Sequence, residues 1–291
     1  MEKMGVTMAF FGTTNNTAPS ANPFRFPNLE NDTRHYTHRL GRFSVLEHDR
    51  DISVAPDNAV TEYFMAKMGV RRRQLVVRLD GASSAIIQAG AMQWMLGDIE
   101  MTTGVKGAGD LFGKMVRGAV TGERAIKPEY RGNGMIVLEP THKHIILQDV
   151  ANWGSGGIVV EDGMFFASEG TVQHRLVSRS TASSAFAGGE GFFNLALSGS
   201  GVVALESNVP FEELIEIELV GDTLKIDGHM AVAWSASLDF TVERSGKSLI
   251  GSAASGEGLV NVYRGTGKVL MSPVASSFTF GAAAHNVSEK L

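Results

Sequence analysis

The sequence predicts an all-β protein with one short N-terminal helix. Glycine occurs 34 times among 291 residues, well above its usual share of about 7%, which indicates many tight turns. Between the glycines, apolar and polar residues alternate with the period of two typical of half-buried strands, as in residues 214–219 and 238–243. This glycine-punctuated pattern recurs three times, which indicates a triplicated β body.

The N-terminal part of the chain precedes this pattern. Residues 13–35 are rich in Asn, Thr, Pro and Ser and lack a periodic apolar pattern, so we expect residues 1–37 to form a mobile extension. Residues 38–70 then hold a short strand at 43–48, followed by a helix. This region is predicted to lead directly into the β body.

The helix is predicted over residues 57–69. Asp57 is placed to cap the free N–H groups of its first turn, and Gly69 can end it in the left-handed conformation. Four large apolar residues share one face of this helix at helical spacing: Val60, Tyr63, Phe64 and Met68.

Three blocks of about 66 residues make up the predicted triplicated domain, residues 71–275, which a tail at 276–291 follows. Each block has a Gly-Glu pair that leads to a Gly-X-Gly motif and then to an apolar strand. The Gly-Glu pairs are at 122–123, 189–190 and 256–257, and the Gly-X-Gly motifs are at 132–134, 199–201 and 265–267. Because glycine adopts positive φ without steric cost, we expect the Gly-X-Gly motifs to be hairpin turns. One block is too small to bury its own apolar faces, so the three are expected to pack with approximate threefold pseudo-symmetry.

Composition narrows the classes of function. The absence of cysteine excludes disulfides, thiolate nucleophiles and cysteine-bound metal clusters, and it fits a reducing compartment. A net charge of −5 provides no long-range attraction for the phosphates of nucleic acids. We identify no signal peptide and no run of 18 apolar residues, so we expect a cytoplasmic protein without a transmembrane segment, for which nucleic acid is a poor partner.

The strongest candidate for chemistry is a pair of histidines followed by an aspartate. His142 and His144 alternate along a predicted strand, which would point both to one face, and Asp149 can add an oxygen ligand. The arrangement is similar to the first metal motif of cupins, but the spacing differs, Asp replaces the usual Glu, and the other two blocks have no histidine at the matching places. The alternative interpretation is an ordinary pair of histidines at a strand edge.

The recurring glutamates of the Gly-Glu pairs are the next candidates. Glu123, Glu190 and Glu257 can be acid–base groups in equivalent pockets, or carboxylates that accept backbone N–H bonds and fix a tight turn. Their recurrence in all three blocks favours the structural role.

Three further segments carry weaker signals. The glycine-rich residues 104–114 lack the Ser or Thr that a phosphate-binding loop needs after its lysine, which favours a flexible contact loop. Arg71, Arg72 and Arg73 can contact RNA or acidic lipid, but three arginines after a helix also complement its dipole. The serine-rich residues 178–184 lack a His or Asp at the spacing of a hydrolase nucleophile.

Several strings resemble the bacterial branch of the altered-inheritance-of-mitochondria protein 24 family. They include residues 88–92, 188–195 and 255–267, and the resemblance covers about residues 40–275. It implies a β-rich fold of the double-stranded β-helix type, similar to the β-sandwich of the tryptophan RNA-binding attenuation protein and often assembled into homo-oligomers. It also implies a possible protein or membrane-associated partner. It implies no reaction, and it transfers no catalytic, cofactor-binding or metal-binding residue.

We therefore expect a non-enzymatic protein that self-associates and serves as a scaffold or binding module. One alternative is a cupin-like metal-binding enzyme that uses His142, His144 and Asp149. A second alternative is a regulator that binds RNA or a small ligand, which depends on fold analogy alone.

Overall fold

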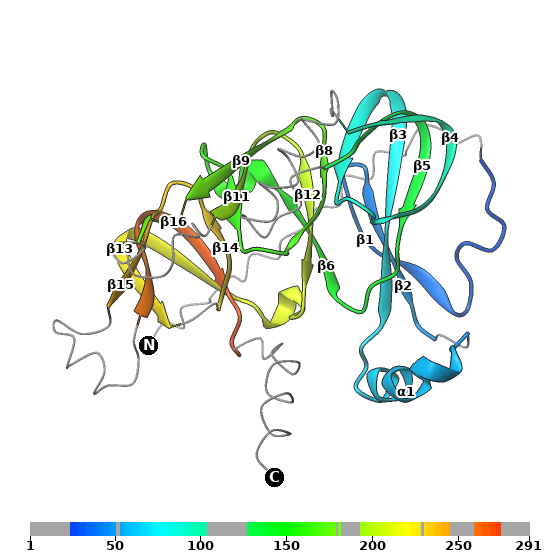
Figure 1. The fold of residues 1–291 in the computed structure, drawn as a ribbon, viewed down its shortest axis with the longest axis horizontal. Helices are drawn as coiled ribbons and strands as arrows, with labels where there is room; N and C mark the ends of the chain where they lie inside the picture. The colour runs from blue at the N-terminus through cyan, green and yellow to red at the C-terminus, as the bar shows by residue number, and fades with distance from the viewer. Residues whose placement is uncertain are drawn as a thin grey trace, which may run out of the picture.

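The computed structural model describes residues 24–50, 53–103, 127–178, 180–181, 193–227, 230–244 and 259–274. Within these residues the chain is mostly β with one short α-helix, which confirms the predicted fold class (Figure 1). The strands form two eight-stranded sheets. No helix among the described residues is long and apolar enough to span a membrane.

The first sheet holds most of the N-terminal strands. Its members are β1 (Arg34–Leu40), β2 (Phe43–His48), β3 (Arg72–Ile87), β4 (Met92–Thr102), β5 (Glu129–Leu138), β6 (His144–Asp149), β8 (Phe165–Glu169) and β12 (Val202–Ser207). The second sheet comprises β7 (Ile158–Val160), β9 (Val172–Ser178), β10 (Ser180–Thr181), β11 (Phe193–Gly199), β13 (Ile215–Asp227), β14 (Ala231–Ser235), β15 (Asp239–Arg244) and β16 (Leu259–Met271). Three 3-10 turns complete the described structure: η1 (Pro56–Asn58), η2 (Val150–Trp153) and η3 (Phe211–Glu213).

The body is elongated, with the two sheets side by side along its long axis. Figure 1 places β3, β4 and β5 at one end and β13, β15 and β16 at the other, with β6, β9, β11 and β12 between them. The buried apolar residues form separate core clusters, which include Phe43, Trp153 and Trp234 respectively. The first and last parts of the predicted triplicated domain therefore lie far apart, and the threefold repeat itself stays a prediction.

The N-terminal segment is folded from an earlier residue than we predicted. Strand β1 begins at Arg34, inside the range assigned to a mobile extension, and Arg34 Nε donates a hydrogen bond of 2.7 Å to the Leu29 carbonyl. Phe26 and Leu29 pack against a small buried cluster that includes Leu46 and Val76. Apolar anchors spaced too widely to look periodic explain why the sequence pattern missed this segment.

The helix is present but differs from its prediction at two points. Helix α1 (Ala59–Lys67) begins after Asn58, whose side chain makes no capping bond, whereas the predicted cap was Asp57. Gly69 ends it with φ 76°, as predicted. The apolar face is open to solvent, with exposures of 70% for Val60, 58% for Tyr63, 59% for Phe64 and 78% for Met68. These four side chains therefore do not hold the helix to the body.

The Gly-X-Gly motifs are not hairpin turns, and this prediction was wrong. Residues 132–134 and 265–267 lie inside the continuous strands β5 and β16, and residues 199–201 connect β11 of one sheet to β12 of the other. The predicted positive φ is nevertheless present, at 137° for Gly132, 94° for Gly199 and 119° for Gly265. At residues 199–201 the chain passes from one sheet to the other, and at Gly132 the backbone of β4 lies too close for a side chain, because a Cβ there would be 2.0 Å from the Asp98 carbonyl oxygen.

Candidate functional site: a charged cluster at the base of helix α1

Several sequence-predicted candidates meet where α1 joins the first sheet. We call this group the helix-base cluster. It comprises His35, Glu47, Asp49, Glu62, Arg71, Arg72, Arg73 and His142. Antiparallel pairing of β2 with β3 places Glu47 opposite Arg73, and a β-bridge between Arg73 and Thr141 brings the segment before β6 alongside. The chain thus gathers acids from β2 and α1 around a basic run from the start of β3.

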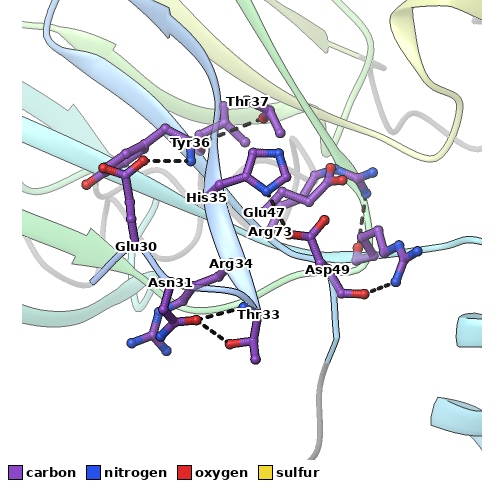
Figure 2. Close-up of polar contacts among 12 residues, drawn as sticks. Glu30, Asn31, Thr33, Arg34, His35, Tyr36, Thr37, Glu47, Asp49 and Arg73 are labelled. Atoms are coloured by element: carbon purple, nitrogen blue, oxygen red, sulfur yellow. Dashed lines mark hydrogen bonds and ion pairs between the residues drawn. The ribbon is translucent and has the colours of Figure 1, made fainter. Parts of the chain in front are cut away.

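The arginine run is paired within the chain. Arg73 is 9% exposed, its Nε lies 2.7 Å from Glu47 Oε2, and its Nη1 donates to the Arg71 carbonyl at 3.0 Å. Arg71 itself donates to the Asp49 carbonyl. Figure 2 shows the His35 ring beside the Asp49 carboxylate, and its Nδ1 lies 2.7 Å from Asp49 Oδ2. The Glu47 carboxylate and two backbone carbonyls thus accept hydrogen bonds from Arg73 and Arg71 that an RNA phosphate or an acidic lipid could otherwise accept.

Glu62 is the link between the helix and the body. Its side chain is only 10% exposed; Oε1 pairs with Arg72, and Oε2 lies 3.3 Å from His142 Nε2. Because the apolar face of α1 points away from the body, this carboxylate is the main described polar anchor of the helix. A charge removed from water in this way is stable only while its partners are in place.

The two candidate histidines have different environments. Burial lowers the pKa of His144, and the Arg73 guanidinium lowers it further, against the opposing charges of Glu212, Glu47 and Glu213. His144 is therefore neutral at neutral pH, while His142 faces the Glu62 carboxylate.

The predicted metal triad is not assembled. Asp149 lies at the far end of β6, five residues from His144, which corresponds to about 17 Å of extended strand. Its Oδ1 accepts a hydrogen bond of 2.9 Å from the Ala151 N–H and so caps η2. Within the described residues, no three histidines or carboxylates are close enough together to hold a metal ion.

The other candidates fall mostly outside the described structure. Glu123, Glu190, Glu257 and the glycine-rich residues 104–114 lie beyond the described residues, as do 179 and 182–184 of the serine-rich segment. Sequence reasoning missed Glu47 and Glu62 as partners of the arginines. The available signal was the alternation of β2 and β3, which places Glu47 and Arg73 in register once the strands are known to pair.

The fold and this cluster define an elongated all-β protein whose charged candidates pair with one another at the root of a protruding helix. Comparison with known proteins refines this class. The chain belongs to the family described as mitochondrial biogenesis AIM24, whose model matches residues 67–274.

Two streptococcal proteins are similar to this chain. An uncharacterised protein of Streptococcus pyogenes serotype M6 is 28% identical over 200 residues, which cover 66% of this chain and 78% of that protein. A crystal structure of another Streptococcus pyogenes protein is 22% identical with a TM-score of 0.56, and it covers 87% of this chain and 100% of that one. The second likeness shows the fold.

Replacing the helix anchor is expected to loosen α1. The substitution Glu62→Gln removes the charge that faces Arg72 and His142, and weakening such a part-buried pair costs about 1–3 kcal/mol. We expect amide hydrogen exchange across residues 59–67 to become at least about fivefold faster, while exchange in β3 stays the same. Lys67→Gln is the matched control, because Lys67 lies over the exposed Tyr63 ring and not in the cluster. Equal exchange in both variants would show that Glu62 does not hold the helix.

Proposed function

We propose that this protein self-associates and acts as a scaffold through contact between copies and not through a chemical reaction. The observation that carries the proposal is an open strand edge at each end of the body. Among the described residues, β4 pairs only with β5, and β13 pairs only with β16.

The exposed side chains at these edges support the proposal. Met95, Leu96 and Met101 of β4 are 42%, 39% and 51% exposed, and Ile215 and Val220 of β13 are 43% and 84% exposed. A long edge strand with unpaired backbone groups and exposed apolar side chains is a template for pairing with another chain. A second copy of the same chain is the partner that is always present with it.

The geometry favours this function over the two alternatives. A cupin-like metal enzyme would need His142, His144 and Asp149 around one point, but Glu62 contacts His142 and Asp149 caps η2. An RNA-binding regulator would need free cations, but carboxylates of the same chain face Arg72 and Arg73.

Size-exclusion chromatography with light scattering tests the proposal. We expect the mean mass to exceed 31.1 kDa and to rise with concentration over the micromolar range, because edge pairing between copies is a mass-action equilibrium. A mass equal to one chain at every concentration would contradict it.

A further inference from the structure

The strongest feature beyond the helix-base cluster is a strand pairing that occurs twice within the chain. Strand β8 pairs with β12 on one side and with the end of β3 on the other. Strand β14 likewise pairs with β16 on one side and with β7 on the other. We call β4, β8 and β14 the entry strands, and we call β7 and the second halves of β3 and β13 the exit strands.

The entry strands have a common register. Trp94, Ala167 and Ala233 pair with Val137, Ala204 and Leu270, and each of these partners follows the second glycine of a Gly-X-Gly motif by three residues. Each entry strand also has a register irregularity just before this position. The three entry strands therefore take the same place beside the Gly-X-Gly strands.

The exit strands can be aligned in the same way. Ile86, Val159 and Lys225 pair with Glu129, Ala196 and Val262, which precede the first glycine of a Gly-X-Gly motif by three residues. An exit strand pairs with an entry strand at two places inside the chain, which we call the internal junctions. Ile86 pairs with Ser168 at the first, and Val159 pairs with Trp234 at the second. Ser168 and Trp234 each directly follow the aligned entry residue, so the two junctions have one register.

One entry strand and one exit strand have no such partner among the described residues. In the part of the chain that the structure describes, no strand pairs with the outer edge of β4 or with that of the second half of β13. They lie at opposite ends of the body (Figure 1). At the internal junctions, Phe165–Ala167 of β8 and the whole of β7 are buried, whereas Met95 and Leu96 of β4 are exposed.

We propose that β13 of one copy pairs antiparallel with β4 of a second copy, in the register of the two internal junctions. This inference rests on the proposed self-association and names its interface. Lys225 then faces Met95 of the second copy, Leu224 faces Leu96, and Ile226 faces Trp94. The contact is head to tail, so each added copy presents a new free edge, and the assembly grows as a ring or a filament.

The side chains at the proposed junction are compatible with this contact. Two of the three facing pairs are apolar on both sides, and such cross-strand pairs stabilise a sheet. The third pair sets Lys225 against a methionine, so none of these three pairs sets like charges against each other. The pairing also covers two of the exposed apolar side chains of β4.

Cysteine cross-linking tests the register, because the chain contains no cysteine of its own. Leu224→Cys and Leu96→Cys are prepared separately, mixed in equal amounts and oxidised. Directly opposite residues of an antiparallel pair have Cα atoms about 4.5–5.5 Å apart, within the range that a disulfide spans. We expect a cross-linked dimer on a non-reducing gel from the mixture and none from either variant alone.

Met101→Cys mixed with Leu224→Cys is the matched control. Met101 is exposed on the same strand but lies five residues out of register, about 17 Å away. Equal cross-linking in the control, or cross-linking of either variant alone, overturns the proposed register. If the wild type forms oligomers but the mixture of Leu224→Cys and Leu96→Cys does not cross-link, this interface is wrong and self-association still holds. If the wild type is monomeric, both proposals are wrong.

A charge exchange provides a second measurement that a folding defect cannot imitate. Met95→Lys places like charges opposite each other and is expected to weaken association by up to about fivefold. Adding Lys225→Glu restores opposite charges and is expected to recover the wild-type mass by light scattering. Failure of the double variant to recover association would contradict the pairing of Lys225 with Met95.

Discussion

Gly132→Ala is expected to lower the free energy of unfolding by more than about 4 kcal/mol, the range reserved for severe steric defects. A Cβ at this position would lie 2.0 Å from the Asp98 carbonyl oxygen and 3.0 Å from the Ile99 Cα. Both obstacles are backbone atoms of β4, so no side chain can rotate away. The φ of 137° adds strain of its own. Urea denaturation followed by circular dichroism measures the loss.

Gly163→Ala separates the clash from the backbone strain. Gly163 also has a positive φ, 76°, but a Cβ there would meet nothing within 4 Å. Its cost should therefore be limited to about 1–2 kcal/mol, the price of a left-handed residue with a side chain. Equal losses in the two variants would mean that β4 does not approach β5 as closely as the structure shows.

His174 is expected to make the protein sensitive to mild acid. Burial, together with the nearby charge of Lys127, lowers its pKa from 6.5 to about 4. Its Nε2 lies 2.8 Å from the hydroxyl of Ser168, and its ring packs edge-on to Phe165. Protonation would place an additional charge in this confined environment.

The direction of the effect follows from proton linkage. Above pH 6.5, His174 is neutral in both the folded and the unfolded chain and does not affect stability. Between pH 6.5 and 4 the unfolded chain binds a proton that the folded chain does not, so stability falls as the pH falls. A pKa difference of this size corresponds to about 3 kcal/mol by pH 4.

The substitution His174→Gln isolates this contribution. Glutamine stays neutral and can still hydrogen-bond the Ser168 hydroxyl. We expect the stability difference between wild type and variant to shift by about 3 kcal/mol in favour of the variant from pH 7 to pH 4. Parallel stability curves over this range, measured by urea denaturation, would exclude His174 as the source of acid sensitivity.

The sequence predicted the elements better than their partners. The β class, the helix and its stop at Gly69 follow from local spacing and from the conformational freedom of glycine, which neighbouring residues alone determine. The positive φ at the Gly-X-Gly motifs was predictable for the same reason. Their role as hairpin turns was not, because a bend inside a long strand and a turn between two strands require the same backbone freedom.

The candidate site shows the same division. The basic run and the two histidines stood out in the sequence, but nothing local indicated that Glu62 would meet Arg72 and His142, which lie 10 and 80 residues further along the chain. Asp149 was grouped with the histidines by proximity in sequence, and the extended β6 separates them.

By itself, then, the sequence determined that this chain is a glycine-rich β protein with a short helix and without cysteine chemistry. Only the tertiary structure decided that the helix turns its apolar face outward, that the arginines are paired, and that the two ends of the body expose strand edges. The reason is physical: φ preferences and alternation act between adjacent residues, whereas ion pairs, sheet register and burial depend on segments that folding alone brings together.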